Sequence, residues 1–241
     1  MTALDPPRLV PTPAGDARIT SAPASDARAV LALGHGAGGG VESRDLRALA
    51  AALPAHGVTV ALVEQPWRVA GRKLAPAPKT LDAGWTAVWG ALRAQGLPVV
   101  AGGRSAGARV ACRTARELGA VAVLALAFPL HPPGRPERSR AGELAAAGLP
   151  TLVVQGGNDP FGRPEEFVAE FPGEFSERPS PGPGPGAGGA AGGVAERELL
   201  AVPHADHAFA VPKRAPLDEA AALRVVTDGV ADWLERVLRG V

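Results

Sequence analysis

The stretch Val-Val-Ala-Gly-Gly-Arg-Ser-Ala-Gly, residues 99–107, joins a buried-strand pattern to a serine between two glycines. A helical pattern follows at residues 106–118. This order of strand, tight turn and helix is typical of a nucleophile elbow. The serine then lies on a strained turn at the end of the strand, with its hydroxyl exposed. A Cβ at position 103 or 107 would collide with the neighbouring strand or helix, so glycine is required there. These features predict that Ser105 is a nucleophile.

Two further residues supply the partners that such a serine needs. A serine hydroxyl requires a base to take its proton and an acid to orient that base. Asp159 comes four residues after a strand pattern, and His207 closely follows the strand pattern at residues 198–202. Both therefore fall at the carboxyl edge of a parallel sheet, where α/β active sites gather. The order predicts a catalytic triad of Ser105, Asp159 and His207, with His204 as a competing candidate for the base.

A glycine-rich stretch at residues 34–40 is the candidate oxyanion loop. It follows a strand pattern and opens the next helix. Acyl transfer develops negative charge on the carbonyl oxygen, which needs two backbone N–H groups turned toward it. We expect these donors to come from Ala106, directly after the nucleophile, and from Ala37 in this loop. The side chain of His35 is expected to lock the loop.

Four other side chains are candidates for binding the substrate because they follow predicted strands or flank the expected triad. They are Trp67, Arg104, His131 and Phe161. They do not identify the substrate or its acyl chain.

Strand and helix patterns alternate along most of the chain, which predicts an α/β-hydrolase-type fold: a mostly parallel central sheet covered by helices on both faces. We interpret residues 1–241 as a single domain. The expected strands are 29–33, 58–63, 98–101, 121–127, 151–155 and 198–202, and the expected helices are 43–53, 79–94, 106–118, 165–170 and a C-terminal helix with Pro216 near its first turn.

Residues 173–196 are rich in proline and glycine. A segment with so few large apolar side chains cannot offset the entropy of ordering, so we expect a low-complexity, disordered insertion. It also lacks the apolar face that a lipase-type lid requires.

The overall composition indicates which classes of partner and which cellular compartment to expect. A net charge of +1 leaves no broad basic field for nucleic acid. The single cysteine, Cys112, cannot form an internal disulfide, and the N-terminus lacks a signal-peptide pattern. The longest uncharged apolar run, residues 118–134, is interrupted and too short for a membrane span. We therefore expect a cytoplasmic protein without nucleic-acid or membrane partners.

Two other parts of the sequence resemble a metal site and a dinucleotide site. His204, Asp206 and His207 cluster in sequence, but no separate ligand motif accompanies them, so we expect no metal and no cofactor. Gly34, Gly36 and Gly39 also fit a dinucleotide-binding G-x-G-x-x-G pattern, with an acid at position 64. The same spacing recurs by composition at positions 184, 186 and 189, and a dinucleotide site would leave the predicted triad unexplained.

The chain resembles the α/β-hydrolase-like family of testis-expressed protein 30 and NSL complex subunit 3, close to the dienelactone-hydrolase-like enzymes. The segments that carry the resemblance are residues 34–39, 102–111, 128–137, 154–162 and 205–209. The resemblance implies that Ser105, Asp159 and His207, rather than His204, are the family's serine, acid and histidine. Ala108 departs from a glycine common in the family, and the proline- and glycine-rich insertion is not a family feature.

Together these features favour a serine carboxyl-ester hydrolase that acts on a small soluble ester, or a related acyl substrate, through an acyl-enzyme. The alternative is a non-catalytic protein-interaction module that keeps the same fold and binds a protein partner. The sequence leaves the oligomeric state open.

Overall fold

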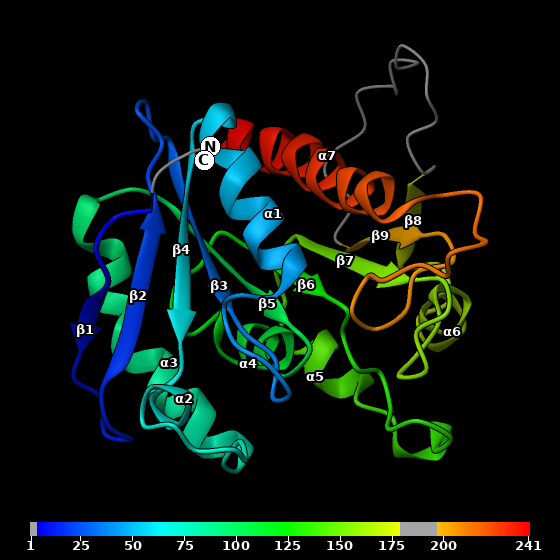
Figure 1. The fold of residues 1–241 in the computed structure, drawn as a ribbon, viewed down its shortest axis with the longest axis horizontal. Coiled ribbons are helices and arrows are strands. Elements are labelled where there is room, and N and C mark those ends of the chain that lie inside the picture. The colour runs from blue at the N-terminus through cyan, green and yellow to red at the C-terminus, as the bar shows by residue number, and fades with distance from the viewer. Residues whose placement is uncertain (1–3, 179–196) are drawn as a thin grey trace.

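The computed structural model describes residues 4–178 and 197–241. Among these residues, nine strands form one sheet in the order β1-β2-β4-β3-β5-β6-β7-β9-β8 (Figure 1). The strands are β1 Arg8–Val10, β2 Ala17–Ala22, β3 Ala29–Gly34, β4 Val58–Glu64, β5 Val99–Arg104, β6 Ala122–Leu126, β7 Thr151–Gly156, β8 Phe175–Arg178 and β9 Arg197–Val202. Strands β3 to β9 pair in parallel, whereas β1 and β2 join the edge by antiparallel pairing.

Helices cover both faces of the sheet. The α-helices are α1 Arg44–Ala52, α2 Pro66–Val69, α3 Pro78–Leu92, α4 Ala106–Thr114, α5 Ala141–Ala145, α6 Pro164–Glu170 and α7 Glu219–Val237. Short 3-10 helices lie at Leu53–His56, Arg93–Gln95, Pro136–Arg138 and Leu238–Gly240. No helix of the described segments is long and apolar enough to cross a membrane.

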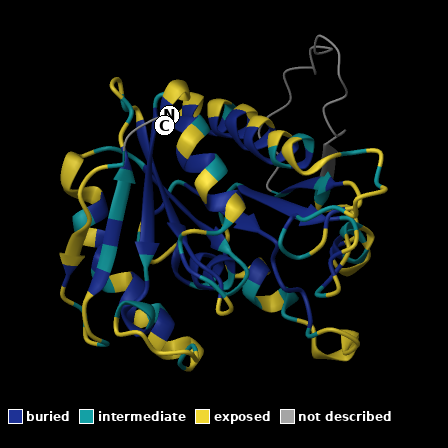
Figure 2. Cartoon of the chain, viewed as in Figure 1, coloured by how far each residue is buried: buried dark blue, intermediate teal, exposed yellow. Residues whose placement is uncertain are grey.

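Each face of the sheet has its own apolar core. Buried residues of α1 and α7, such as Leu49 and Trp233, pack over one face, and α1 and α7 lie side by side across the front of the molecule (Figure 1). Buried residues of α3 and α4, such as Trp85 and Val110, pack over the other face. The central strands are buried on both sides, while α1 and α7 expose their outer faces (Figure 2). This two-faced burial is typical of a parallel sheet.

The predicted fold class is confirmed, and all six expected strands are present with small shifts at their ends. Two local predictions were wrong. Pro216 precedes the last helix, which begins after the N-cap Asp218; the side-chain oxygen of Asp218 accepts from the Ala221 N–H at 2.7 Å. The α-helical part of the expected helix 106–118 ends at Thr114. Ser43 occupies the N-cap position of α1, but its side chain makes no capping hydrogen bond.

Some elements were absent from the sequence-based prediction. Strands β1 and β2 and the short helix α2 were missed. Residues 175–178, which the sequence assigned to the disordered insertion, form β8 and pair in parallel with β9. The prediction of disorder is therefore wrong for those four positions. Residues 179–196 lie outside the described residues.

Candidate active site

Ser105 lies on a sharp turn between β5 and α4. Its backbone φ is +53°, a left-handed value that is rare for a residue with a side chain and that stores strain at functional turns. The Ser105 N–H donates to the Leu126 carbonyl oxygen on β6 at 2.9 Å, which fixes the turn to the sheet. A Cβ on Gly107 would lie 2.5 Å from the Gly34 carbonyl oxygen, and one on Gly103 would lie 2.6 Å from the Gly107 carbonyl carbon. The predicted need for glycine at both positions is confirmed.

Ser105, His207 and Asp159 form a continuous chain of short contacts. The Oγ of Ser105 lies 2.9 Å from Nε2 of His207, and Nδ1 of His207 lies 2.7 Å from Oδ2 of Asp159. Because an ionised carboxylate only accepts, Nδ1 carries the proton toward Asp159, and Nε2 is left to accept from the serine hydroxyl. His204 is exposed, and its backbone carbonyl accepts from the Asn158 side chain. His207 is therefore the histidine in reach of the serine.

The carboxylate of Asp159 is fully buried and held from three directions. Besides His207, its Oδ2 accepts from Nε2 of Gln155 at 2.8 Å, and its Oδ1 accepts from the Phe161 N–H at 2.8 Å. Gln155 also donates to the Gly162 carbonyl oxygen at 2.8 Å, so it ties the acid to the loop that follows. The sequence prediction missed Gln155 because a buried glutamine at a strand end carries no motif.

Arg104, directly before the nucleophile, contacts the histidine loop. Its Nη2 donates to the backbone carbonyl of His207 at 2.6 Å, and its Nε lies 3.3 Å from Oδ2 of Asp45 on α1. Asp45 is completely buried, and this burial raises the pKa of its carboxyl group, although the charge of Arg104 opposes the increase. The Arg104 guanidinium therefore holds two segments together, and Asp45 is a partner that the sequence prediction missed.

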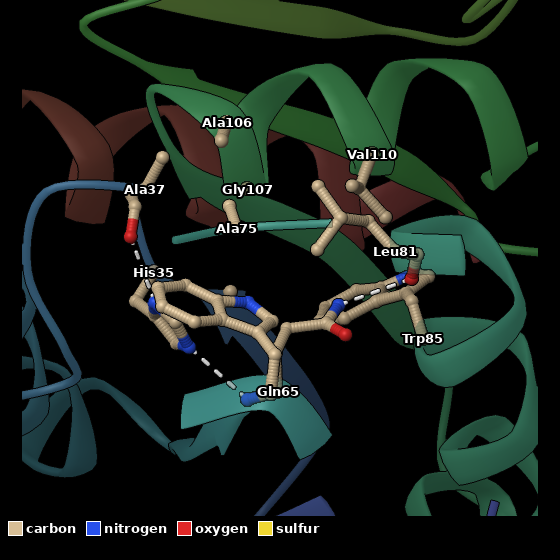
Figure 3. A pocket seen from close by; sticks show the side chains of 12 residues that line it. His35, Ala37, Gln65, Ala75, Leu81, Trp85, Ala106, Gly107 and Val110 are labelled. Carbon is tan, nitrogen blue, oxygen red and sulfur yellow. Dashed lines mark hydrogen bonds between the residues drawn. The ribbon is translucent and has the colours of Figure 1, made fainter. Parts of the chain in front are cut away.

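The loop after β3 is locked by His35, as the sequence predicted. His35 Nε2 accepts from the Gln65 backbone N–H at 3.0 Å, and Nδ1 lies 2.9 Å from the Gly36 carbonyl oxygen (Figure 3). These partners require the neutral ring, with the proton on Nδ1. Burial lowers the pKa of His35, which also favours the neutral ring, and the nearby Gly36 carbonyl only partly opposes this.

The two expected oxyanion donors lie around one pocket. Ala37 from the loop after β3 and Ala106 from the start of α4 both line it, together with Gly107 (Figure 3). The pocket therefore brings together the two backbone segments whose N–H groups were expected to face the oxyanion. Assignment of these groups as the oxyanion donors stays a prediction.

The four predicted substrate-binding residues occupy three different surroundings. Phe161 and Arg104 line an open cleft together with Ser105 and His207, and the Phe161 ring lies 4.3 Å from the His207 ring. Trp67 is buried in the pocket of Ala37 and Ala106, with its ring 5.6 Å from that of His35.

His131 lines neither the open cleft nor the pocket of Ala37 and Ala106. Its Nε2 lies 2.8 Å from a Glu166 carboxylate oxygen, and its backbone N–H donates to the Phe161 carbonyl. Burial opposes protonation of His131, but the Pro132 carbonyl and the Glu166 carboxylate outweigh it and raise the pKa of His131. This geometry favours support of the Phe161 loop, and substrate binding by His131 stays a prediction.

Two observations concern the metal and dinucleotide patterns of the sequence. Within residues 4–178 and 197–241, no group of three or more histidine, cysteine, aspartate or glutamate side chains is arranged to hold a metal ion. Glu64, the candidate ribose-binding acid, makes an ion pair of 2.9 Å with Arg18 on the adjacent strand.

A family model described as an alpha/beta hydrolase domain matches residues 27–178. The chain belongs to the alpha/beta hydrolase family. The match includes Ser105 and Asp159 and ends before His207, whose place in the site comes from the tertiary structure. A search of curated proteins found no match.

Solved structures with the same fold cover nearly the whole chain. An α/β serine hydrolase without a lid from Xanthomonas campestris is 18% identical, with a TM-score of 0.66, covering 95% of this chain and 94% of that one. Dienelactone hydrolase from Anabaena variabilis is 18% identical, with a TM-score of 0.67 and coverage of 95% and 96%. Est1E from Butyrivibrio proteoclasticus is 14% identical, with a TM-score of 0.65 and coverage of 98% and 100%. At such identities the likeness shows the shared fold.

Proposed function

We propose that this protein is a cytoplasmic serine hydrolase that cleaves carboxyl esters of small soluble molecules. The observation that carries the proposal is the unbroken contact from Ser105 through His207 to the buried Asp159, at 2.9 and 2.7 Å. An interaction module with the same fold has no need of this arrangement, because it performs no proton transfer.

In the proposed reaction, Ser105 Oγ attacks the ester carbonyl carbon while His207 Nε2 takes the hydroxyl proton. Asp159 keeps the imidazole in the required tautomer and stabilises the imidazolium. The N–H groups of Ala37 and Ala106 bind the oxyanion of the tetrahedral intermediate. His207 then protonates the departing alkoxide, which leaves an acyl-enzyme. A water molecule, deprotonated by His207, then attacks the carbonyl carbon of the acyl-enzyme; as the Ser105 Oγ–carbon bond breaks, His207 returns the proton to Oγ and the acid is released.

We assign residues to the substrate-binding surface from their places around the cleft. Phe161 and Arg104 line the cleft that contains Ser105 and His207, so we propose that they border the bound substrate. The resemblance to the family of testis-expressed protein 30 and NSL complex subunit 3 implies the same triad, and we propose that the protein is related to that family. The relatives named as a dienelactone hydrolase and as a serine hydrolase support a hydrolytic role.

Active-site labelling tests the proposal. A fluorophosphonate probe is expected to label the folded protein at one mole per mole, on Ser105, and to abolish hydrolysis of p-nitrophenyl acetate. Ser105→Ala removes both. Ser139→Ala is the matched control because Ser139 is exposed. Its hydroxyl donates a hydrogen bond to Glu170 instead of to a histidine.

Absence of labelling on Ser105 in folded protein, with no turnover on an ester panel, overturns the catalytic proposal. In that case, a stable protein partner whose binding survives Ser105→Ala would support the interaction module.

A further inference from the structure

Two spaces of very different size adjoin the loop that is expected to hold the oxyanion. The outer cleft is lined by Ser105, His207 and Phe161 and holds about 550 Å³. The inner pocket lies under the oxyanion loop and holds about 10 Å³, which is the room of a single water-sized group. Ala37 lines both, so the two spaces adjoin at the oxyanion loop.

The position of His207 decides which half of an ester enters which space. In the proposed reaction His207 must protonate the departing alkoxide, so the alcohol oxygen has to lie within hydrogen-bonding reach of its Nε2. His207 lines the outer cleft and is not among the residues of the inner pocket. The alcohol half of the ester therefore lies in the outer cleft.

The remaining substituent of the carbonyl carbon is the acyl chain. In the proposed reaction the carbonyl oxygen binds to the N–H groups of Ala37 and Ala106, and the leaving oxygen faces His207. The inner pocket is lined by both alanines and also by Leu81 and Val110, so it is the apolar space beside the expected oxyanion donors that an acyl chain would enter.

Large and well-packed side chains form one wall of the inner pocket. Its apolar wall includes Leu81 and Trp85 from α3 and Val110 from α4, which are all buried (Figure 3). Trp85 packs against Trp89 with ring centroids 5.9 Å apart. Gln65 donates from its side chain to the Leu81 carbonyl at 3.2 Å, which ties this wall to the start of α2.

We propose, resting on the proposed function above, that the substrates are esters of a short acyl group of about two carbons with a larger alcohol. A longer acyl chain collides with Leu81, Trp85 and Val110, and close-packed interiors give way reluctantly to added methylene groups. The open cleft sets no comparable limit on the alcohol.

The test compares kcat/KM for p-nitrophenyl acetate, butyrate and octanoate, after subtracting the rate of Ser105→Ala at equal concentration. The wild-type protein is expected to prefer acetate over butyrate by about tenfold or more, because a pocket of fixed size discriminates by this order per added group. Octanoate is expected to react more slowly again.

Two matched substitutions on α3 test whether the inner pocket sets the acyl preference. Leu81→Ala removes part of the inner wall and is expected to raise the butyrate-to-acetate ratio at least fivefold. Leu92→Ala is the control, because Leu92 is buried on the same helix but does not line the inner pocket. It is expected to leave the ratio unchanged.

Two results overturn the inference while leaving the proposed function intact. One is ester hydrolysis with butyrate or octanoate equal to acetate or better. The other is an unchanged acyl preference in folded Leu81→Ala. Absence of both Ser105 labelling and hydrolysis removes the proposed function, and the inference fails with it.

Discussion

Nη2 of Arg104 donates a hydrogen bond of 2.6 Å to the backbone carbonyl of His207, which lies 103 positions later in the chain. The same guanidinium faces the buried Asp45 across 3.3 Å. Arg104 therefore connects the nucleophile turn, the start of α1 and the histidine loop. Because Arg104 directly precedes Ser105, we expect this contact to help position the histidine relative to the serine.

Replacing Arg104 by methionine is expected to lower kcat about tenfold to a hundredfold, with a smaller effect on KM. A hydrogen bond to a charged group contributes about 1.5–3 kcal/mol, and this range corresponds to that rate loss when it falls on the transition state. Arg104→Lys should recover part of kcat. Steady-state kinetics and a thermal melt on the same samples separate this loss from unfolding.

Arg44→Met is the matched control for Arg104. Arg44 lines the same cleft, but it pairs with Glu219 at the surface, where both side chains are substantially exposed. Removing it changes the charge of the cleft without touching the histidine loop. An equal loss of kcat in both variants would refute the positioning role and indicate that the cleft charge matters instead.

Asp159→Asn is expected to lower kcat about a thousandfold to ten-thousandfold. The asparagine is close to the same size, but its amide can donate to Nδ1 of His207 and so favours the tautomer that cannot accept from Ser105. Steady-state kinetics on acetate esters, with folding checked by circular dichroism, measure the effect. A loss of less than tenfold would argue against Asp159 as the orienting acid.

His35 is expected to make the protein less stable in mild acid. Burial lowers its pKa from the ordinary value of 6.5, so the unfolded chain binds a proton more readily than the folded one. The contribution of His35 to stability is therefore fully present above pH 6.5 and is lost as pH falls from there through the lowered pKa. Urea unfolding of the wild type and His35→Gln between pH 5 and 8 measures this.

The difference between the two unfolding free energies isolates His35, because every other titrating group is common to both proteins. It should shrink as the pH falls below 6.5. A difference that stays constant across this range contradicts a neutral His35 in the folded state.

Glu143 is expected to stabilise the packing of α4 against α5. Its two carboxylate oxygens accept from Arg109 at 2.6 Å and from Arg113 at 2.5 Å. Burial alone would raise the pKa of Glu143, but the hydrogen bonds and charges of these arginines lower it from the ordinary 4.5. The carboxylate therefore contributes stability above pH 4.5, which is lost as pH falls through the lowered pKa.

Glu143→Gln should reduce the unfolding free energy by about 1–2 kcal/mol at pH 7, since the pairs are only partly shielded from water. The reduction should shrink below pH 4.5. Glu137→Gln, at an exposed position, is the control and is expected to change stability by less than about 0.5 kcal/mol. Equal effects of the two variants in denaturant titrations would contradict the role of Glu143.

The elements missed from the sequence share a physical cause. Strand β1 has only three residues and pairs with the neighbouring β2, while β2 joins the sheet by antiparallel pairing with β4, which lies much later in the chain. Strand β8 has only four residues and is completed by its pairing with β9. A short strand is stabilised by its neighbours in the sheet, so its own pattern carries little signal.

By contrast, the central strands and the turn around Ser105 could be predicted from local residues alone. Continuous aliphatic runs indicate strands buried on both faces, and the glycines at 103 and 107 follow from the close approach of β5, α4 and β3. Asp159 and His207 could be chosen because parallel strands end at one edge of the sheet.

The sequence by itself determined the parallel sheet, the nucleophile turn and the identities of the serine, acid and histidine candidates, because each depends on patterns within a few residues. Only the tertiary structure decided the distances that join Ser105, His207 and Asp159, the contacts of Gln155 and Arg104 with this site, and the small size of the pocket under the oxyanion loop. Those features depend on contacts between segments far apart in the chain, and their distances are set by how strands and helices pack.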